Sequence, residues 1–350
     1  MSAANTSWTE QEDQDALAYD YEDFATLHPT RTWNAYRFRK SRIQRKHRVM
    51  DTASISAKPE PSDDELEELF TSLERAEAAR AGLSPTEDTI TVNAPDDLPC
   101  GIAFMSDIHA GASGVDYARF RHDLEVIRDT DGLYTIVNGD LLENAKVMSK
   151  AGNALYHAAF ANPREQITYV RKRLSIARGK ILAILSGNHD SRDGMYAGID
   201  RLPQLCRDLD VPYGTEAGMT VNFVVGGHQY VVVAKHDYTG KSNITKSNSA
   251  RRMWTEWPHS WDSADVIALA HLHEANLSVQ YQRGQEVVWL RSGAFKIHDE
   301  YALSKGYKST YGVPIVVFFP GTRKMIAFLD FDEGVRYLNA VRSEWNALAA

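Results

Sequence analysis

The sequence predicts an α/β protein in which helices flank a sandwich of two β-sheets, preceded by a mostly helical or disordered N-terminal appendage. Short runs of aliphatic residues recur from about residue 96 and have the length and composition of strands buried on both faces. Helix-like segments separate the first of these runs, which indicates βαβ units and a largely parallel sheet. After His273 the chain becomes richer in strands, which indicates a second sheet packed on the first.

The appendage is predicted over residues 1–95, which contain no strong strand run. Its segment 31–48 holds eight Lys or Arg and no acidic residue. As a helix, this basic segment would suit a DNA backbone or an acidic partner, or it could neutralise the acidic stretches on either side of it in the chain. Further on, Ser62 and Glu65 form a capping-box pattern, which predicts a helix over 62–81.

The main domain is predicted over residues 96–335. Between its early strands, we expect helices at 117–128, 163–178 and 199–209, the second with Pro163 at a permitted first-turn position. Late strands are expected at 286–291, 313–319 and 325–331, with a Pro320-Gly321 turn between the last two. A helix-like segment over 336–350 ends the chain.

Five of the apolar runs end abruptly in residues of the types that bind metal ions. These are, in chain order, Asp107 and His109; Asp140; Asn188 and His189; His236; and His271 and His273. A sheet places its functional groups at the carboxyl ends of its strands, so we expect one edge of one sheet to gather these side chains. Carboxylate, amide oxygen and imidazole bind hard or borderline divalent cations, and hydrolysis of phosphate esters gains from two such ions roughly 3.5–4 Å apart. The pattern therefore predicts a two-metal site.

In this order the residues resemble the calcineurin-like metallophosphoesterase superfamily, whose motifs run D-x-H, G-D, G-N-H-D/E, a lone His and G-H-x-H. Four of the five blocks are intact between Asp107 and His273, and in the fifth Ala270 stands where the family usually has Gly. Asp237 follows the lone His, where many relatives have Gly. The resemblance covers about half of the chain and does not extend to residues 1–95. It implies a sandwich of the metallophosphoesterase type.

The resemblance also implies roles for single residues. One aspartate and two histidines would hold a first metal ion, one asparagine and two histidines a second, and a further aspartate would bridge the ions. These implied ligands are, in that order, Asp107, His109, His273, Asn188, His236, His271 and Asp140. His189 would not be a ligand but would donate a hydrogen bond or a proton to the ester oxygen, with Asp190 orienting it. The implied cofactor is a pair of divalent metal ions; manganese is expected, with iron or zinc as alternatives.

The segment 240–262 lies between two implied ligands and interleaves cations with tryptophans. Its residues of these types are Lys241, Lys246, Arg251, Arg252, Trp254, Trp257 and Trp261. Cations beside aromatic side chains form platforms for single-stranded nucleic acid. Alternatively, the tryptophans belong to the core under a short helix over 249–256. The candidate substrate-binding residues are Lys241, Arg251, Arg252 and Trp254.

The composition restricts the surroundings in which the protein works. A net charge of −8 argues against attraction of nucleic acid or anionic membrane to the whole surface, although a local basic patch can still act. The two cysteines, Cys100 and Cys206, cannot form a disulfide framework, so a reducing compartment is expected. No apolar stretch approaches the roughly 20 residues of a membrane span. The first thirty residues are acidic and lack Lys and Arg, unlike a signal peptide. A cytoplasmic location is expected.

Together these observations predict a two-metal-dependent phosphoester hydrolase that uses a metal-activated water. Its expected substrate is a phosphodiester in nucleic acid, on the strength of the two basic segments, 31–48 and 240–262. A phosphomonoesterase or a phosphodiesterase for small nucleotides is the alternative enzyme. A non-catalytic scaffold that docks partners through its N-terminal region is the alternative from another class.

Overall fold

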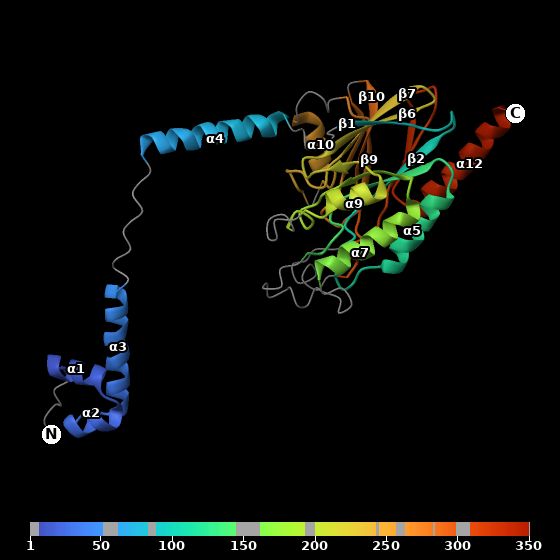
Figure 1. The fold of residues 1–350 in the computed structure, drawn as a ribbon. Helices are drawn as coiled ribbons and strands as arrows, with labels where there is room; N and C mark the ends of the chain where they lie inside the picture. The colour runs from blue at the N-terminus through green and yellow to red at the C-terminus, as the bar shows by residue number, and fades with distance from the viewer. Residues whose placement is uncertain are drawn as a thin grey trace. The chain divides into compact units, whose positions relative to one another are not determined.

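The computed structural model describes residues 7–51, 62–82, 89–144, 162–192, 200–242, 245–256, 263–282, 284–298 and 309–349. The chain separates into two units, Met1–Leu83 and Ser84–Ala350 (Figure 1). The second unit thus begins before residue 96, where the sequence placed its start. The reason is β1, Thr89–Asn93, which pairs in parallel with β6 and is part of a large sheet. Exposed and buried side chains mix in this strand, so its pattern lacks a clear apolar run.

The first unit contains four helices among its described residues: α1 (Glu10–Ala18), α2 (Tyr21–Leu27), α3 (Trp33–Asp51) and α4 (Asp63–Gly82). We call residues 7–51, which carry α1 to α3, the three-helix module. Its small core consists of Ala16, Phe24 and Tyr36, with Trp8 and Tyr21 packed against them. The helix α4 begins where the capping box predicts, because Ser62 and Glu65 bond each other's backbone N–H groups.

The second unit contains two six-stranded sheets. The first sheet has the order β12-β11-β2-β3-β4-β5, with bounds Met325–Phe328, Ile315–Phe318, Cys100–Met105, Leu133–Asn138, Ile181–Leu185 and Tyr213–Gly214. The second sheet has the order β1-β6-β7-β8-β10-β9, with bounds Thr89–Asn93, Met219–Val225, His228–Ala234, Val266–Leu269, Gln285–Arg291 and Asn276–Gln282. Strands β2 to β5 are parallel, β11 pairs with β2 in antiparallel fashion, and β12 pairs with β11 in antiparallel fashion. The predicted two-sheet sandwich is confirmed.

Three apolar layers hold this unit together. One lies between the sheets, and its largest side chains include Phe104, Phe223 and Phe318. A second lies between the first sheet and four helices, α5 (Tyr117–Asp129), α7 (Pro163–Leu174), α9 (Leu202–Leu209) and α12 (Phe331–Ala349) (Figure 1). The third joins α10 (Asn248–Glu256) to the second sheet. Strands such as β2 and β4 are therefore buried on both faces, which explains their unbroken apolar sequences.

The C-terminal helix starts earlier than the sequence indicates. α12 begins at Phe331 rather than Arg336, and its residues Phe331, Leu338 and Val341 lie in the layer against the first sheet. It is thus part of the second unit and not a separate terminal segment. The helix expected over 163–178 divides into α7 and a short 3₁₀ turn, Ser175–Ala177.

The expectation that one sheet gathers all five strand ends is wrong. β2, β3 and β4 belong to the first sheet, whereas β7 and β8 belong to the second. An apolar run does not reveal which sheet its strand joins, because strands of both sheets are buried alike. The strand ends nevertheless meet, since Asn138 at the end of β3 donates its amide N–H groups to the carbonyls of Lys235 (3.0 Å) and Ala268 (3.2 Å). These carbonyls lie at the ends of β7 and β8, so one side chain joins the two sheets.

Among the helices that the structure describes, none combines the length and apolar character that a membrane span requires.

Candidate metal centre

The strand-end loops hold their functional residues in an unusual backbone conformation. Five of the implied ligands have φ between 49° and 71°, namely Asp107, His109, Asp140, His271 and His273. This left-handed region is uncommon for residues with a side chain and costs energy, so the surrounding structure must enforce it. Close packing adds to the constraint, because a Cβ at Gly187 would collide with Oδ1 of Asp140. Such local strain concentrates at functional sites.

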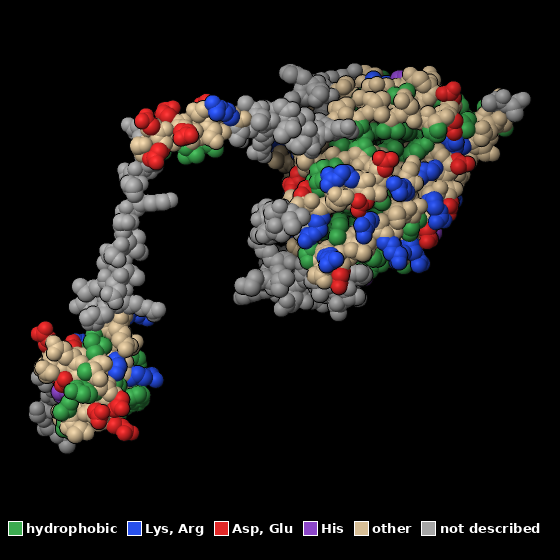
Figure 2. Space-filling model, viewed as in Figure 1, with side chains coloured by type: hydrophobic (Ala, Val, Ile, Leu, Met, Phe, Trp, Pro, Cys, Tyr) green, Lys and Arg blue, Asp and Glu red, His purple; other side chains and the backbone are tan. Residues whose placement is uncertain are grey.

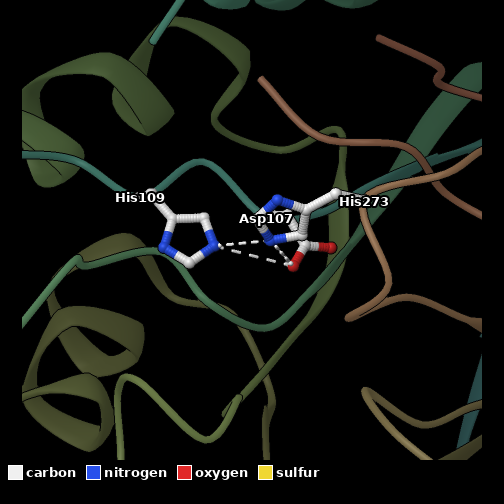
Figure 3. A group of neighbouring side chains, drawn as sticks. All are labelled: Asp107, His109 and His273. Atoms are coloured by element: carbon white, nitrogen blue, oxygen red, sulfur yellow. Dashed lines mark hydrogen bonds and ion pairs between the residues drawn. The ribbon is translucent and has the colours of Figure 1, made fainter. Parts of the chain in front are cut away.

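Three of these side chains face one another in a first group (Figure 3). Nε2 of His273 lies 3.1 Å from Oδ1 of Asp107 and 2.9 Å from Nε2 of His109. Nε2 of His109 lies 3.7 Å from the same Asp107 oxygen. Asp107 and His109 follow β2 in the first sheet and His273 follows β8 in the second. The group therefore joins the two sheets.

The remaining atoms of this group are fixed by the protein. Oδ2 of Asp107 accepts hydrogen bonds from the hydroxyl of Ser106 (2.6 Å) and from the backbone N–H of His271 (3.1 Å). Its Oδ1 is buried and makes no hydrogen bond. Nδ1 of His109 donates to Oε2 of Glu143 at 2.9 Å, which leaves the lone pair of Nε2 for a ligand. The two atoms that remain for a ligand, Oδ1 of Asp107 and Nε2 of His109, thus face the centre of the group.

A second group consists of Asp140, His236 and His271. Nε2 of His236 lies 3.1 Å from Oδ2 of Asp140, while its Nδ1 donates to the carbonyl of Asn138 at 2.7 Å. Asp140 also reaches the first group, because its Oδ2 lies 3.8 Å from Nε2 of His109. Asp140 therefore stands between the two groups, as a bridging ligand must.

The charges of the centre favour a cation. Burial alone would raise the pKa of Asp140, but His236, His189 and His109 around it hold that pKa far below its ordinary value. Burial alone would lower the pKa of both His236 and His109, yet Asp140 and Asp107 raise the first to about 10 and carboxylates raise the second to about 9. The ionised carboxylates thus draw positive charge into a buried space.

Orphaned atoms show that the residues fit metal ions. Buried polar atoms in proteins nearly always have a hydrogen-bond partner, so each exception requires an explanation. Among the described residues, the centre concentrates several such exceptions: Asp107 Oδ1, Asn188 Oδ1, His236 Nε2 and His271 Nδ1. All are oxygen or nitrogen atoms with lone pairs, and divalent cations bind such atoms. This donor set suits the divalent ions that the sequence implies.

The comparison with protein families agrees with this geometry. The model of the calcineurin-like phosphoesterases matches residues 101–317, which is more than half of the chain. The chain belongs to this family. It is therefore a metallophosphoesterase. The members of this family are metal-binding hydrolases that act on phosphoesters. A comparison with the curated proteins finds no match.

Solved structures with a related arrangement include other phosphoesterases. The calcineurin-like phosphoesterase YfkN from Bacillus subtilis is 12% identical, with a TM-score of 0.37, and the match covers 71% of this chain and 97% of that one. Sulfate thiohydrolase SoxB from Thermus thermophilus is 11% identical, with a TM-score of 0.36 and coverage of 74% and 60%. A Saccharomyces cerevisiae protein serine/threonine phosphatase is 13% identical, with a TM-score of 0.32 and coverage of 70% and 84%. At these TM-scores, none of the three likenesses supports a particular substrate for this chain.

In this phosphoesterase, His189 lies beside the metal groups. Its ring meets that of His109 edge-on at a centroid distance of 4.6 Å. Nδ1 of His189 lies 2.6 Å from the carbonyl oxygen of Glu143, and its backbone N–H donates to Oδ1 of Asp140 at 2.8 Å. Burial lowers the pKa of His189 to about 4. With Nδ1 held by the carbonyl, Nε2 is the atom that a substrate can meet.

Asp190 does not have the orienting role that the sequence predicts. Its carboxylate accepts hydrogen bonds from the backbone N–H groups of Leu142 (2.9 Å), Gly187 (3.0 Å) and Leu141 (3.2 Å). Burial, followed by the nearby Asp140, raises its pKa to about 7. Adjacent residues of a turn point in different directions, and Asp190 points to the loop after β3. It positions the loop that carries Asp140, while the Glu143 carbonyl orients His189.

Sequence reasoning missed three charged residues of the site. Glu143 is buried and joins His109 to Lys296, whose Nζ lies 3.3 Å from Oε2 of Glu143. Arg192 places Nη1 2.9 Å from Nδ1 of His189. Glu143 had a visible signal, because it is an acidic residue that follows Asp140 after two leucines in the same loop. Lys296 lies far from any motif, so no sequence signal identifies it.

Of the predicted substrate-binding residues, Lys241 borders the centre. Its Nζ lies 2.8 Å from Oδ2 of Asp237, and the same oxygen lies 3.7 Å from Nε2 of His271. The side chain of Lys241 is 43% exposed and so can reach a substrate. Asp237, which stands where many relatives have Gly, thus links the lysine to an implied ligand.

The other three candidates lie on α10. Arg251 is exposed, and Arg252 pairs with Glu256 at 2.9 Å. Trp254 is only 2% exposed and packs near Trp289, with a ring-centroid distance of 6.5 Å. The interpretation of Trp254 as a stacking platform is therefore wrong, because the amphipathic helix turns it to the sheet. Trp257 and Trp261 lie outside the described residues.

Proposed function

We propose that this phosphoesterase holds two divalent metal ions and hydrolyses phosphodiesters in nucleic acid with a metal-activated water. The position of Asp140 carries the two-metal part of the proposal. Its Oδ2 lies 3.1 Å from His236 and 3.8 Å from His109, one residue from each group. The proposed ligands are Asp107, His109 and His273 for one ion, Asn188, His236 and His271 for the other, and Asp140 for both.

When bound, the ions lower the pKa of a water towards about 7 and neutralise charge on the phosphoryl oxygens. The residues of the chain supply the remaining functions. Glu143 and the Asn138 carbonyl accept the Nδ1–H groups of His109 and His236, so that each ring directs Nε2 to the centre, where a bound ion would take the place of the proton. His189 directs Nε2 to the ester. Because its Nδ1–H is donated to the Glu143 carbonyl, it would donate a hydrogen bond or proton from Nε2 to the leaving oxygen as the imidazolium, a form that the negative charge of a bound phosphoester favours.

Cations around the centre support a polyanionic substrate. Arg192 lies beside His189, and Lys241 lies beside Asp237. A nucleic acid offers several phosphates at once, so separate cations outside the metal groups can each meet one. A small monoester would contact the metal groups alone. Manganese is the proposed ion, since the mixed nitrogen and oxygen ligands accept it together with iron and zinc.

A substrate panel with metal-reconstituted protein tests the proposal. Apo protein is loaded with Mn²⁺, Zn²⁺ or Fe²⁺, and bound metal is counted before each assay. We expect about two ions per chain and Mn²⁺-dependent hydrolysis of bis-(p-nitrophenyl) phosphate and of oligonucleotides. Activity confined to p-nitrophenyl phosphate would overturn the nuclease proposal and leave the two-metal site intact. Metal-loaded protein that hydrolyses no ester would favour the scaffold.

A further inference from the structure

In the three-helix module, α3 has an inward face that contacts the other two helices and an outward face that is exposed to solvent. The inward face carries Tyr36, which is 4% exposed, and Arg39, whose Nε donates to Oδ1 of Asp13 at 2.6 Å. Lys40 extends from the same side to the carbonyl of Tyr19 at 2.9 Å. These contacts fix the rotation of α3 about its axis. The opposite side is therefore turned to solvent in a defined way.

The outward face of α3 is basic and polar. Its exposed side chains recur at intervals of three and four residues, which places them on one face of the helix: Asn34, Arg37, Phe38, Ser41, Arg42 and Arg45. Residues 32–50 contain no acidic residue. Figure 2 shows Lys and Arg side chains along the side of the module that α3 forms. The face thus combines positive charge with hydrogen-bonding groups.

Several acidic residues of the module make contacts away from the outward face of α3. Glu12 pairs with Arg31 at 2.7 Å and Asp15 with His28 at 2.8 Å. Asp20 caps α2 by accepting the backbone N–H of Glu22 at 3.0 Å. The basic segment therefore neutralises acids with some of its members, as one of the two sequence interpretations expected. The outward residues of α3 take no part in these pairs.

The order of α2, a short connection and α3 is similar to that of a DNA-reading motif, the helix-turn-helix. α2 and α3 are joined by the short segment 28–32, in which the N–H of Arg31 donates to the carbonyl of His28 at 3.0 Å. In helix-turn-helix domains, the second helix after such a turn enters the major groove with its N-terminal residues on the bases. Asn34 and Arg37 occupy this position in α3.

We propose that the three-helix module binds double-helical DNA with the outward face of α3 in the major groove. Each exposed residue type suits that surface. Asn and Arg read adenine and guanine edges, Phe contacts thymine methyl groups, and Ser and further Arg residues bind phosphates. The groove of B-DNA admits a helix, whereas the major groove of duplex RNA is too narrow and deep. The module would bring duplex DNA to the proposed nuclease, but the binding itself is independent of the metal centre.

Fluorescence anisotropy with the full chain tests this proposal. The probe is a labelled DNA duplex of roughly 20 base pairs, about two helical turns. EDTA is present throughout, so failure of binding here and failure of hydrolysis in the substrate panel are separate results. The test variant combines Arg37→Ala, Arg42→Ala and Arg45→Ala. A matched control removes three exposed cations from the phosphoesterase unit, Arg164→Ala, Lys172→Ala and Arg178→Ala.

We expect the test variant to bind duplex DNA roughly tenfold more weakly or worse, with a salt slope reduced by about 2, because Arg42 and Arg45 contact phosphates whereas Arg37 contacts a base. The control should bind within about twofold of the unaltered chain, and both variants should keep its far-UV circular dichroism. The proposal is overturned by an unaltered chain that does not bind the duplex, by equal losses in test and control variants, or by equal affinity for duplex RNA.

Discussion

Oδ2 of Asp140 lies 3.1 Å from Nε2 of His236, and both side chains are almost completely buried. Replacing Asp140 by Asn keeps the size of the side chain but removes the charge that both metal groups share. We expect Asp140→Asn to lose bound metal and to lower kcat by roughly 10³-fold, since the ions supply several kcal/mol of transition-state stabilisation. Metal counting and steady-state kinetics measure both effects. Asp129→Asn, at an exposed position, is the control, and wild-type turnover in Asp140→Asn would contradict the bridging role.

His189→Ala should separate catalysis from metal binding. Because His189 is proposed to meet the ester rather than the ions, the variant should keep its metal content while kcat falls by about 10²–10⁴-fold. The loss should be smaller for nitrophenyl esters than for an oligonucleotide, since nitrophenolate leaves without needing a proton. Equal losses on both substrates would argue that His189 does not donate to the leaving oxygen.

A substitution of Glu143 tests whether the residue that orients His109 affects the metal affinity of the centre. Glu143→Gln retains a hydrogen-bond acceptor but loses the charge that faces Nδ1 of His109. We expect about 10–100-fold weaker metal affinity, with activity recovered at high metal concentration. Metal titration of activity measures this shift. Glu286→Gln, an exposed change on β10, should leave the titration curve in place.

Trp254 should matter for stability and not for substrate. Removing a large buried aromatic side chain costs roughly 3–5 kcal/mol, so urea unfolding of Trp254→Ala should show this loss. KM for an oligonucleotide should not change in the folded fraction. Arg251→Ala, on the exposed side of the same helix, should change the free energy of unfolding by less than about 0.5 kcal/mol. A raised KM without loss of stability in Trp254→Ala would restore the stacking interpretation.

Low pH should destabilise the three-helix module. Hydrogen bonding to Arg31 lowers the pKa of Glu12 from its ordinary 4.5 to about 2. A carboxyl whose pKa is lower in the folded state contributes its stability fully above pH 4.5, and this contribution is lost as the pH falls from 4.5 towards about 2. Hydrogen exchange of residues 7–51, corrected for the intrinsic rates, should show protection decreasing over that window. Glu12→Gln should show a smaller pH dependence, and an identical profile would contradict the assignment.

The proposed ligands could be selected from the sequence because each lies within four residues of the end of a buried strand, and such strands have a strong apolar signal. The division of these strands between two sheets could not be predicted, because β3 and β8 have similar apolar sequences and differ only in which neighbours they pair with. The place of Glu143 in the loop after Asp140 is visible in the sequence, but its role depends on its distance from His109, which the path of the chain sets. The orienting role of Asp190 was predicted wrongly for a related reason: the spacing of residues along the chain does not show in which direction a side chain points. The burial of Trp254 follows from the rotation of α10 about its axis.

The group of Asp107 and the group of Asp140 each contain a carboxylate from the first sheet and at least one imidazole from the second. A bound ion would therefore act as a cross-link that closes one end of the sandwich, and Asn138 already holds that end with its two hydrogen bonds. Phe104 and Phe223 lie in the apolar layer that separates the two sheets, and the two sets of ligands extend from these sheets. We therefore expect a change in core volume between the sheets to alter the distance between the two sets of ligands.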